Sequence, residues 1–509
     1  MAYYLGIDIG TSGTKALIMD ARAKVLATAT AEHGISAPRP GWSEQDPEEW
    51  FSATVKAVRA VVKKARINGK SIAGIGLSGQ MHGLVITDGA GKPLRPSIIW
   101  NDQRTAEQAA FIEQKVGGRD RLIELVGNMA QTSFTLTKLL WVRDNEPRIY
   151  EKVQHMLLPK DYVRLRLTGE YVGEVSDMSG TLMLDQRKRD WSPEILSTFQ
   201  IDKDILPPVV ESHEVTGRLS KAAAARLGLA AGTPVVGGGG DQPAGAIGNG
   251  VVVDGLTSAT MGTSGVVFTH SKNYRTDPLS RVGTFCASVA GQWCIFGCVL
   301  SAGGSFQWFR NTLAAAEVAA AKKKKIDPYE LLTAQAAKAP PGCEGLFWLP
   351  YLTGERTPHS DPQARACWIG IHSRTTRNEL VRSVMEGATF AMNDAVQLLK
   401  GLGLDITQIR LSGGGARSSF WRQLQADIYG TTCVTINAEE GAAYGVALLA
   451  AAGTGRFKDI REACRAGIKV TRTIKPKAAA LKRYAALYAQ YRRLYPALKA
   501  EFPRLAELS

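Results

Sequence analysis

One carboxylate stands alone in the glycine-rich stretch VVGGGGDQPAGAIGNG, residues 235–250. Asp241 follows four glycines and precedes Gln242, Pro243 and a run of small residues that favours a helix. A carboxylate in this setting can orient a hydroxyl group and accept its proton. The positive end of the following helix would favour the ionised acid and so weaken it as a base. The structural alternative is that Asp241 is only the N-cap of that helix, because aspartate is a common cap and proline suits an early helical position.

Three other glycine-rich segments have the composition of phosphate-binding loops. They are DIGTSGTK (8–15), MGTSG (261–265) and SGGGAR (412–417). Glycine lets backbone N–H groups approach an anion without a Cβ in the way. A plain β-hairpin with a polar turn is the alternative for any one of them, but two Gly-Thr-Ser-Gly turns and a triple glycine together favour phosphate binding.

The first of these segments carries the most chemistry. Thr11 and Ser12 offer hydroxyl groups, and Lys15 offers a mobile positive charge. Asp8 ends the preceding apolar run and would repel a phosphate unless a cation lay between them. We therefore expect Mg²⁺ near Asp8, held through water, since Mg²⁺ sheds its hydration reluctantly.

The elements that must position these groups repeat along the chain. Residues 3–9, 14–20 and 25–33 alternate apolar and polar side chains, which predicts antiparallel strands joined by short turns. The tetrapeptide Gly-Thr-Ser-Gly occurs at 10–13 and again at 262–265, each time between two strand-like runs. This repeat predicts an α/β protein of two similar lobes with a ligand cleft between them.

Composition narrows the class of protein further. The chain has 509 residues, 45% of them hydrophobic and 21% charged, as in an ordinary globular protein. The formal net charge of +15 arises largely from 322–325 and from a C-terminal segment with helical spacing, which we interpret as solvated helix faces and not as a nucleic-acid groove. The apolar stretches are too short to span a membrane, and the N-terminal residues have no signal-peptide pattern. We expect a cytoplasmic protein with no nucleic-acid or membrane partner.

Long matches to a known family extend over almost the whole chain. The three glycine-rich segments resemble the first phosphate loop, the second phosphate loop and the adenosine loop of the FGGY carbohydrate kinases, which belong to the actin-like ATPase superfamily. Residues 133–145 and 366–386 resemble the two long signatures of that family. Within the family, the chain resembles the xylulokinase branch most. The segments that carry this resemblance are SGQMHG (78–83), IIWNDQR (98–104), LPKDYVRLRLTGE (158–170) and LTGERTPH (352–359).

The resemblance implies a fold and a set of site residues. The fold would be the two-lobed, ribonuclease H-like one, with a mixed sheet and flanking helices in each lobe. Asp241 would be the catalytic base, with Asp8 the second catalytic acid and the residue nearest Mg²⁺. The sugar would contact Met81, His82, Trp100, Asn101, Asp241 and Gln242. ATP would contact Thr11, Ser12, Lys15, Gly262, Thr263, Gly303, Gln307, Gly414, Gly415 and Ser419. His82 also has an alternative as a satisfied core histidine.

The resemblance also implies a reaction and a division of the chain. The reaction would be ATP-dependent phosphorylation of a ketopentose, D-xylulose first, with ribulose, glycerol or a related sugar, and a non-catalytic sugar-binding protein, as alternatives. The first lobe would cover residues 1–247, the second 248–473, and a C-terminal helix (474–509) would pack back on the lobes. ATP and Mg²⁺ would be the cofactors, and a homodimer is left open. The glycines before Asp241 would let the main chain approach sugar and phosphate.

Overall fold

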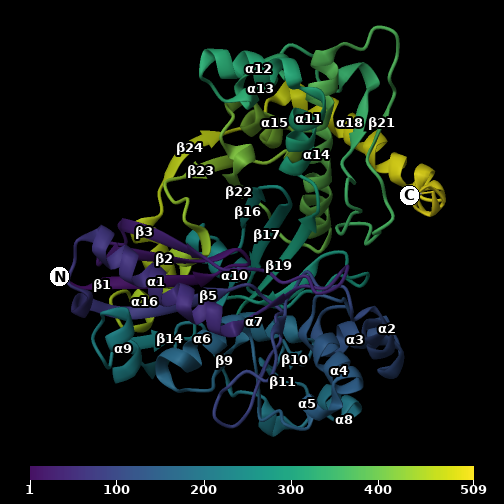
Figure 1. The fold of residues 1–509 in the computed structure, drawn as a ribbon. Coiled ribbons are helices and arrows are strands. Elements are labelled where there is room, and N and C mark those ends of the chain that lie inside the picture. The colour runs from purple at the N-terminus through teal and green to yellow at the C-terminus, as the bar shows by residue number, and fades with distance from the viewer. Residues whose placement is uncertain (509) are drawn as a thin grey trace.

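Two seven-stranded mixed sheets form the frame of the protein. A computed structural model describes residues 1–508. The first sheet has the order β13-β14-β5-β1-β2-β3 with β15 paired to β5, and the second has the order β18-β19-β17-β16-β22-β23-β24. The sheets lie in different halves of the molecule, and the two chain ends lie in different halves as well (Figure 1). The predicted two-lobed α/β architecture is confirmed.

The first lobe is built on the predicted hairpins. Its sheet contains β1 (Tyr3–Ile9), β2 (Gly13–Asp20), β3 (Val25–Glu32), β5 (Ile72–Gly79), β13 (Val215–Arg218), β14 (Pro234–Val236) and β15 (Gly239–Gly240). The helices of this half are α1 (Pro47–Ala65), α2 (Ala106–Lys115), α3 (Arg119–Val126), α4 (Thr135–Asn145), α5 (Pro147–Tyr150), α6 (Pro159–Thr168), α7 (Val175–Met178), α8 (Pro193–Phe199), α9 (Lys221–Leu227) and α10 (Asp241–Gly248). Short strand pairs join β4 (Glu44–Gln45) to β7 (Ser97–Ile98), β6 (Val85–Thr87) to β8 (His155–Leu157), β9 (Gly173–Glu174) to β12 (Val209–Val210), and β10 (Leu184–Asp185) to β11 (Asp190–Trp191).

The second lobe repeats the strand-turn-strand opening. Its sheet contains β16 (Leu256–Met261), β17 (Gly265–Ser271), β18 (Gly283–Cys286), β19 (Trp293–Val299), β22 (Gln408–Gly413), β23 (Cys433–Ile436) and β24 (Val470–Ile474), and β20 (Phe347–Leu349) pairs with β21 (Cys367–Ile369). The helices that follow in the sequence are α11 (Gly303–Leu313), α12 (Ala315–Lys324), α13 (Pro328–Ala336), α14 (Arg377–Gly401), α15 (Ser419–Tyr429), α16 (Gly441–Gly453), α17 (Ile460–Gly467), α18 (Ala478–Leu498) and α19 (Glu501–Glu507). Of these, α16 and α17 pack against the first lobe.

Both Gly-Thr-Ser-Gly turns close antiparallel hairpins, as the repeated tetrapeptide predicts. Strands β1 and β2 pair up to Ile9 and Thr14, and strands β16 and β17 pair up to Met261 and Gly265. The equivalent turns therefore stand at equivalent places in the two sheets.

Helix α16 crosses from the second half of the sequence to the first sheet. It packs on β1 and β5, where a Cβ on Gly6 would collide with the backbone of Ala443 and a Cβ on Gly76 with that of Val446. The opposite face of β1 presents Leu5 and Ile7 to a separate core under α1, α6 and α9. Alternation along β1 therefore places Asp8 on the α16 side of the sheet.

The C-terminal helix α18 packs on the second lobe. It contacts α15, and its buried Tyr484 and Tyr491 join the core that α14 forms with the second sheet. The expected division of the chain at residues 247 and 473 stays a prediction. Within residues 1–508, no helix is both long and apolar enough to cross a membrane.

Candidate active site

Asp8 lies at the carboxyl end of β1 with one oxygen unsatisfied. Its neighbours in register are Ser78 of β5 and Lys15 of β2. Its Oδ1 is buried without a hydrogen-bond partner, and burial raises the pKa of the carboxyl group. Across residues 1–508, no cluster of three or more His, Cys, Asp or Glu side chains is arranged to hold a metal ion. One buried acid with a free oxygen suits a cation that keeps most of its own waters.

Asp241 is the first residue of α10, so the alternative that it is the N-cap of this helix is wrong. The cap position belongs to Gly240, and no side chain caps this helix. Burial, and then the charge of Asp8, raise the pKa of Asp241 to about 7. Desolvation and a second carboxylate therefore outweigh any lowering of this pKa by the helix end, so that the net shift makes Asp241 a stronger base than we expected.

The glycines before Asp241 are explained by crowding from the protein itself. Gly238 has φ +76°, and a Cβ there would collide with the carbonyl oxygen of Leu77 in β5. A Cβ on Gly239 would collide with the hydroxyl of Ser288. The absent side chains let the loop lie against β5 and the β18–β19 connection. The expected approach of sugar and phosphate to this main chain stays a prediction.

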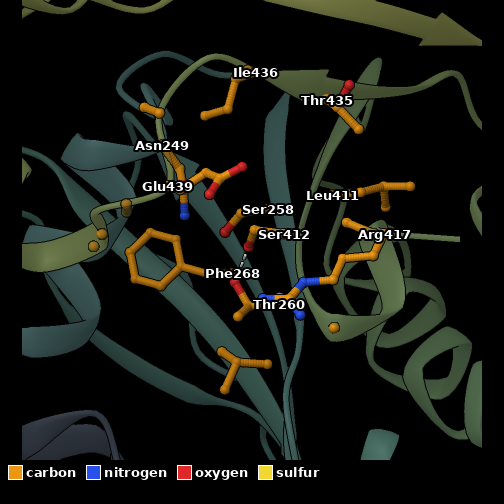
Figure 2. A pocket seen from close by; sticks show the side chains of 18 of the residues that line it. Asn249, Ser258, Thr260, Phe268, Leu411, Ser412, Arg417, Thr435, Ile436 and Glu439 are labelled. Carbon is orange, nitrogen blue, oxygen red and sulfur yellow. Dashed lines mark hydrogen bonds between the residues drawn. The ribbon is translucent and has the colours of Figure 1, made fainter. Parts of the chain in front are cut away.

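A cavity of about 650 Å³ extends from Asp241 between α10 and the second sheet. The alternation that turns Ala259 and Met261 of β16 into the α14 core turns Ser258 and Thr260 toward the cavity. Figure 2 shows these hydroxyl groups on the strands beside Ser412, whose Oγ lies 2.8 Å from Thr260 Oγ1. The remaining lining residues include Gln242, Gly245, Ala246 and Asn249 of α10, and Gly413, Gly414, Ala416 and Glu439.

The adenosine-loop end of this cavity is positively charged. Arg417, Arg422 and Arg472 line it, and Arg422 Nη1 donates to the carbonyl of Ala416 at 2.6 Å. The lining of the cavity therefore combines the half-buried acid Asp241 with three guanidinium groups. A ligand with a polar body and negative charge fits this distribution.

Met81 and His82 lie beside the Asp241 loop at the end of β5. The buried Met81 side chain packs against Gly240. His82 has φ +71°, and its Nδ1 lies 3.0 Å from the carbonyl oxygen of Gly180. Burial and the charge of Lys138 lower the pKa of His82 to about 3, so the ring is neutral at pH 7.

The backbone of His82 is held by residues of the first long family signature. Its carbonyl accepts from Thr135 Oγ1 at 3.1 Å and from Lys138 Nζ at 2.8 Å. Burial lowers the pKa of Lys138 to about 7. The left-handed backbone of His82 is therefore fixed by two side chains of α4.

Trp100 and Asn101 connect the predicted sugar site with the first phosphate loop. The indole Nε1 of Trp100 donates to Thr11 Oγ1 at 2.9 Å. The Asn101 Oδ1 is buried and has no hydrogen-bond partner, so it can accept one from a ligand. Lys15, on the other side of the loop, forms an ion pair with Glu440 at 2.5 Å.

The second phosphate loop is braced by the start of α11. Gly303 N donates to the carbonyl of Gly262 at 2.9 Å, and Gly304 N donates to that of Thr263 at 2.9 Å. Gln307 is exposed on α11, and Ser419 is exposed at the start of α15. Gly415 is buried within the glycine-rich segment 412–417.

The cavity unites only part of the predicted set. Asp241, Gln242 and Gly414 line it. Residues that lie outside its lining are Asp8, Thr11, Ser12, Lys15, Met81, His82, Trp100, Asn101, Gly262, Thr263, Gly303, Gln307, Gly415 and Ser419.

The sequence analysis did not single out several polar lining residues, among them Asn249, Ser258, Thr260, Arg422, Glu439 and Arg472. Arg422, Glu439 and Arg472 lie on a helix, a loop and a strand without a glycine motif, whereas Asn249 lies within the glycine-rich stretch 235–250.

Comparisons with known proteins agree along the whole chain. The N-terminal domain of the FGGY family of carbohydrate kinases matches residues 3–248, and the C-terminal domain of that family matches residues 257–454. A xylulose kinase of Bacillus subtilis (strain 168) is 37% identical over 495 residues, 97% of each chain, and one of Escherichia coli (strain K12) is 38% identical over 460 residues, 90% of this chain and 92% of the other. A crystal structure of a "xyloylose kinase" from Brucella ovis has a TM-score of 0.89 and 36% identity, covering 98% of this chain and 99% of that one. The chain therefore belongs to the FGGY family of carbohydrate kinases.

Proposed function

We propose that this carbohydrate kinase transfers the γ-phosphoryl group of ATP to D-xylulose, giving D-xylulose 5-phosphate. The proposal is supported by relatives named xylulose kinase that match nearly the whole chain, and by the SGQMHG and LTGERTPH segments. The observation that carries it is the half-buried Asp241, with a pKa of about 7, in the lining of a cavity that also includes Gly413, Gly414 and Ala416 of the expected adenosine loop.

Asp241 acts as the general base in this proposal. As the C5 hydroxyl oxygen of the sugar attacks the γ-phosphorus in line, its proton passes to the Asp241 carboxylate, and ADP leaves with the bridging oxygen. Phosphoryl transfer depends mostly on positioning and charge stabilisation, so Asp241 need only orient the hydroxyl and receive the proton as the new bond forms. A pKa near 7 suits both states of that carboxylate at physiological pH.

Asp8 is the residue that would hold Mg²⁺ through water. Its buried oxygen without a partner fits that role, and when bound the ion would neutralise charge on the phosphates. Lys15 and the two Gly-Thr-Ser-Gly turns would contact the phosphates from either lobe. Met81, His82, Trp100 and Asn101 would orient the sugar, and the neutral His82 would do so without adding charge.

The wider context of the enzyme is part of the proposal. We place it in the cytoplasm, where sugar and ATP are available, with those two small molecules as its partners. The lobes would comprise residues 1–247 and 248–473, with 474–509 as the C-terminal helix. A homodimer stays a prediction.

A coupled ADP-release assay over a panel of sugars tests the function. Purified protein with Mg-ATP is offered D-xylulose, D-ribulose, L-ribulose and glycerol. We expect the highest kcat/KM for D-xylulose and a loss of at least 100-fold in kcat for Asp241→Asn. The exposed Asp405 gives the control variant Asp405→Asn, which should match wild type. Turnover of no pentulose, or wild-type kcat in Asp241→Asn, contradicts the proposal.

A further inference from the structure

The LPKDYVRLRLTGE segment forms a buried charge cluster that the proposed reaction does not use directly. Lys160 Nζ lies 2.6 Å from Asp161 Oδ1 and 3.2 Å from Asp177 Oδ2. Arg164 Nη1 lies 3.0 Å from Asp161 Oδ1, and all four side chains have no solvent exposure. Burying four charges is costly unless each is held by partners, so the cluster calls for an explanation beyond stability.

This cluster contacts the glycine loop that carries Asp241. Arg164 Nη2 donates to the carbonyl oxygen of Gly237, the first of the four glycines. The same guanidinium donates through Nη1 to the carbonyl of Val172 at 2.7 Å. One end of the loop is thus tied to α6 by a fixed, planar donor.

The other end of the loop is tied to α7 through a serine. The N–H of Gly240, the residue before Asp241, donates to Ser176 Oγ at 3.2 Å. Ser176 Oγ donates in turn to Glu174 Oε2 at 2.8 Å. Glu174 is itself fixed, since it accepts from Ser176 N at 2.9 Å and from Ser212 Oγ at 2.5 Å.

The hydroxyl of Ser176 also meets the second half of the chain. Ser288, between β18 and β19, places its Oγ 3.1 Å from Ser176 Oγ, and both side chains are buried. The same Ser288 hydroxyl occupies the space beside Gly239 that a Cβ would need. Ser176 therefore lies where three segments meet: α7, the β18–β19 connection of the second sheet, and the glycine loop before Asp241.

We propose that Ser176 is a positioning residue for Asp241, acting through the Gly240 peptide. The inference rests on the proposed function of Asp241. The Asp241 carboxylate accepts hydrogen bonds from its neighbour Gln242, while the main chain that carries it is held from the preceding side through the N–H of Gly240. The Ser176 hydroxyl accepts the hydrogen bond that fixes it, and Glu174 orients that hydroxyl. A reacting hydroxyl must be held within a fraction of an ångström for efficient transfer, so this link sets kcat.

Steady-state kinetics of Ser176→Ala test the proposal. We expect kcat to fall about tenfold with KM for sugar and ATP changed less than twofold, and the acid limb of the pH profile of kcat to move. Ser176→Cys keeps the volume of the side chain with a poorer acceptor, so it should show the same split at an unchanged melting temperature. Asp241→Asn is measured beside them.

The matched control is Ser179→Ala. Ser179 is equally buried, donates to Val175 O at 2.7 Å and accepts from Cys286 N at 3.0 Å, but it makes no hydrogen bond to the glycine loop. The Ser179→Ala variant should be less stable than wild type but should not show the selective fall in kcat that we expect for Ser176→Ala. If Asp241→Asn is inactive while the Ser176 variants keep the kcat and pH profile of Ser179→Ala, the positioning role is overturned and the proposed function stands. If Asp241→Asn turns over like wild type, both are overturned.

Discussion

Lys15 Nζ lies 2.5 Å from Glu440 Oε2, so the cation of the first phosphate loop is paired with an acid at the start of α16. Both side chains are about a third exposed, which makes the pair weak enough to exchange for a phosphate group. With Lys15 contacting the phosphates as proposed, this acid would compete with ATP for the lysine.

The competition predicts a gain in ATP affinity when Glu440 is neutralised. Glu440→Gln should lower KM for Mg-ATP by about two- to fivefold, which is the range expected for losing a partly exposed ion pair. Lys15→Ala should raise the same KM, and the double variant should resemble Lys15→Ala. Initial rates at varied ATP measure this, and an unchanged or higher KM in Glu440→Gln would show that the pair does not oppose binding.

The coupling of Asp8 and Asp241 predicts the pH dependence of activity. Because the basic form of Asp241 is required and its pKa is about 7, log kcat/KM should rise with pH below 7 and level off above it. Asp8→Asn removes the charge that contributes to this high pKa. The variant should be slower, with its acid limb at lower pH. Profiles from pH 5 to 9 measure both, and an acid limb that stays in place would exclude coupling.

The same raised pKa predicts a stability effect with a definite sign. A carboxyl group whose pKa is higher in the folded state binds its proton more tightly there, so stability is lost as pH rises from about 4 through about 7. Asp241→Asn should therefore be more stable than wild type at pH 8, by an upper limit of about 4 kcal/mol at about 1.4 kcal/mol per pKa unit. The gain should shrink toward pH 4.5. Thermal melts at both pH values measure this, with Asp405→Asn expected to show no such difference.

Much of the fold was predictable because local patterns carried it. The alternation in residues 3–32 gave three antiparallel strands, and the repeated tetrapeptide pointed to the hairpins at the two sheets. Helix α1 likewise begins at a local signal, since Asp46 is followed by Pro47 and its side chain accepts from Glu48 N. These features depend on neighbours in sequence, which a single chain displays.

The site was predicted less completely because it depends on contacts between distant segments. The residues near Asp241 in the sequence do not indicate that Ser176 and Ser288 contact its loop. Nor do they indicate that Asp8 raises the pKa of Asp241. The run of glycines before Asp241 was correctly singled out from the sequence. The contacts with β5 and Ser288 that leave no room for side chains there could not be read from it. Such causes appear only once the chain is folded.

The bond between Trp100 and Thr11 predicts a joint effect on both substrates. Thr11→Val keeps the shape of the side chain and removes the acceptor of the indole N–H. Because the bond joins the sugar-site segment to the phosphate loop, KM for sugar and for ATP should both rise, by about two- to tenfold for one lost hydrogen bond. Thr11→Ser retains the hydroxyl and should stay near wild type. An effect on only one KM would show that the bond does not link the two sites.

The packing of Ser288 against the glycine loop predicts a measurable coupling. Gly239→Ala should destabilise the protein by about 1–3 kcal/mol, because the new methyl group meets the Ser288 hydroxyl. Removing that hydroxyl in Gly239→Ala/Ser288→Ala should recover about 1 kcal/mol and not the whole loss, since Ser288 Cβ then lies at an ordinary 3.6 Å but Ser176 Oγ remains 3.2 Å from the new methyl group. Gly245→Ala is the control: its Cβ would meet no atom within 4 Å, so the helix α10 should gain up to about 1 kcal/mol. Urea unfolding of the four variants measures the cycle, and additive effects of Gly239→Ala and Ser288→Ala would mean that the loop relaxes away from Ser288 instead of resting on it.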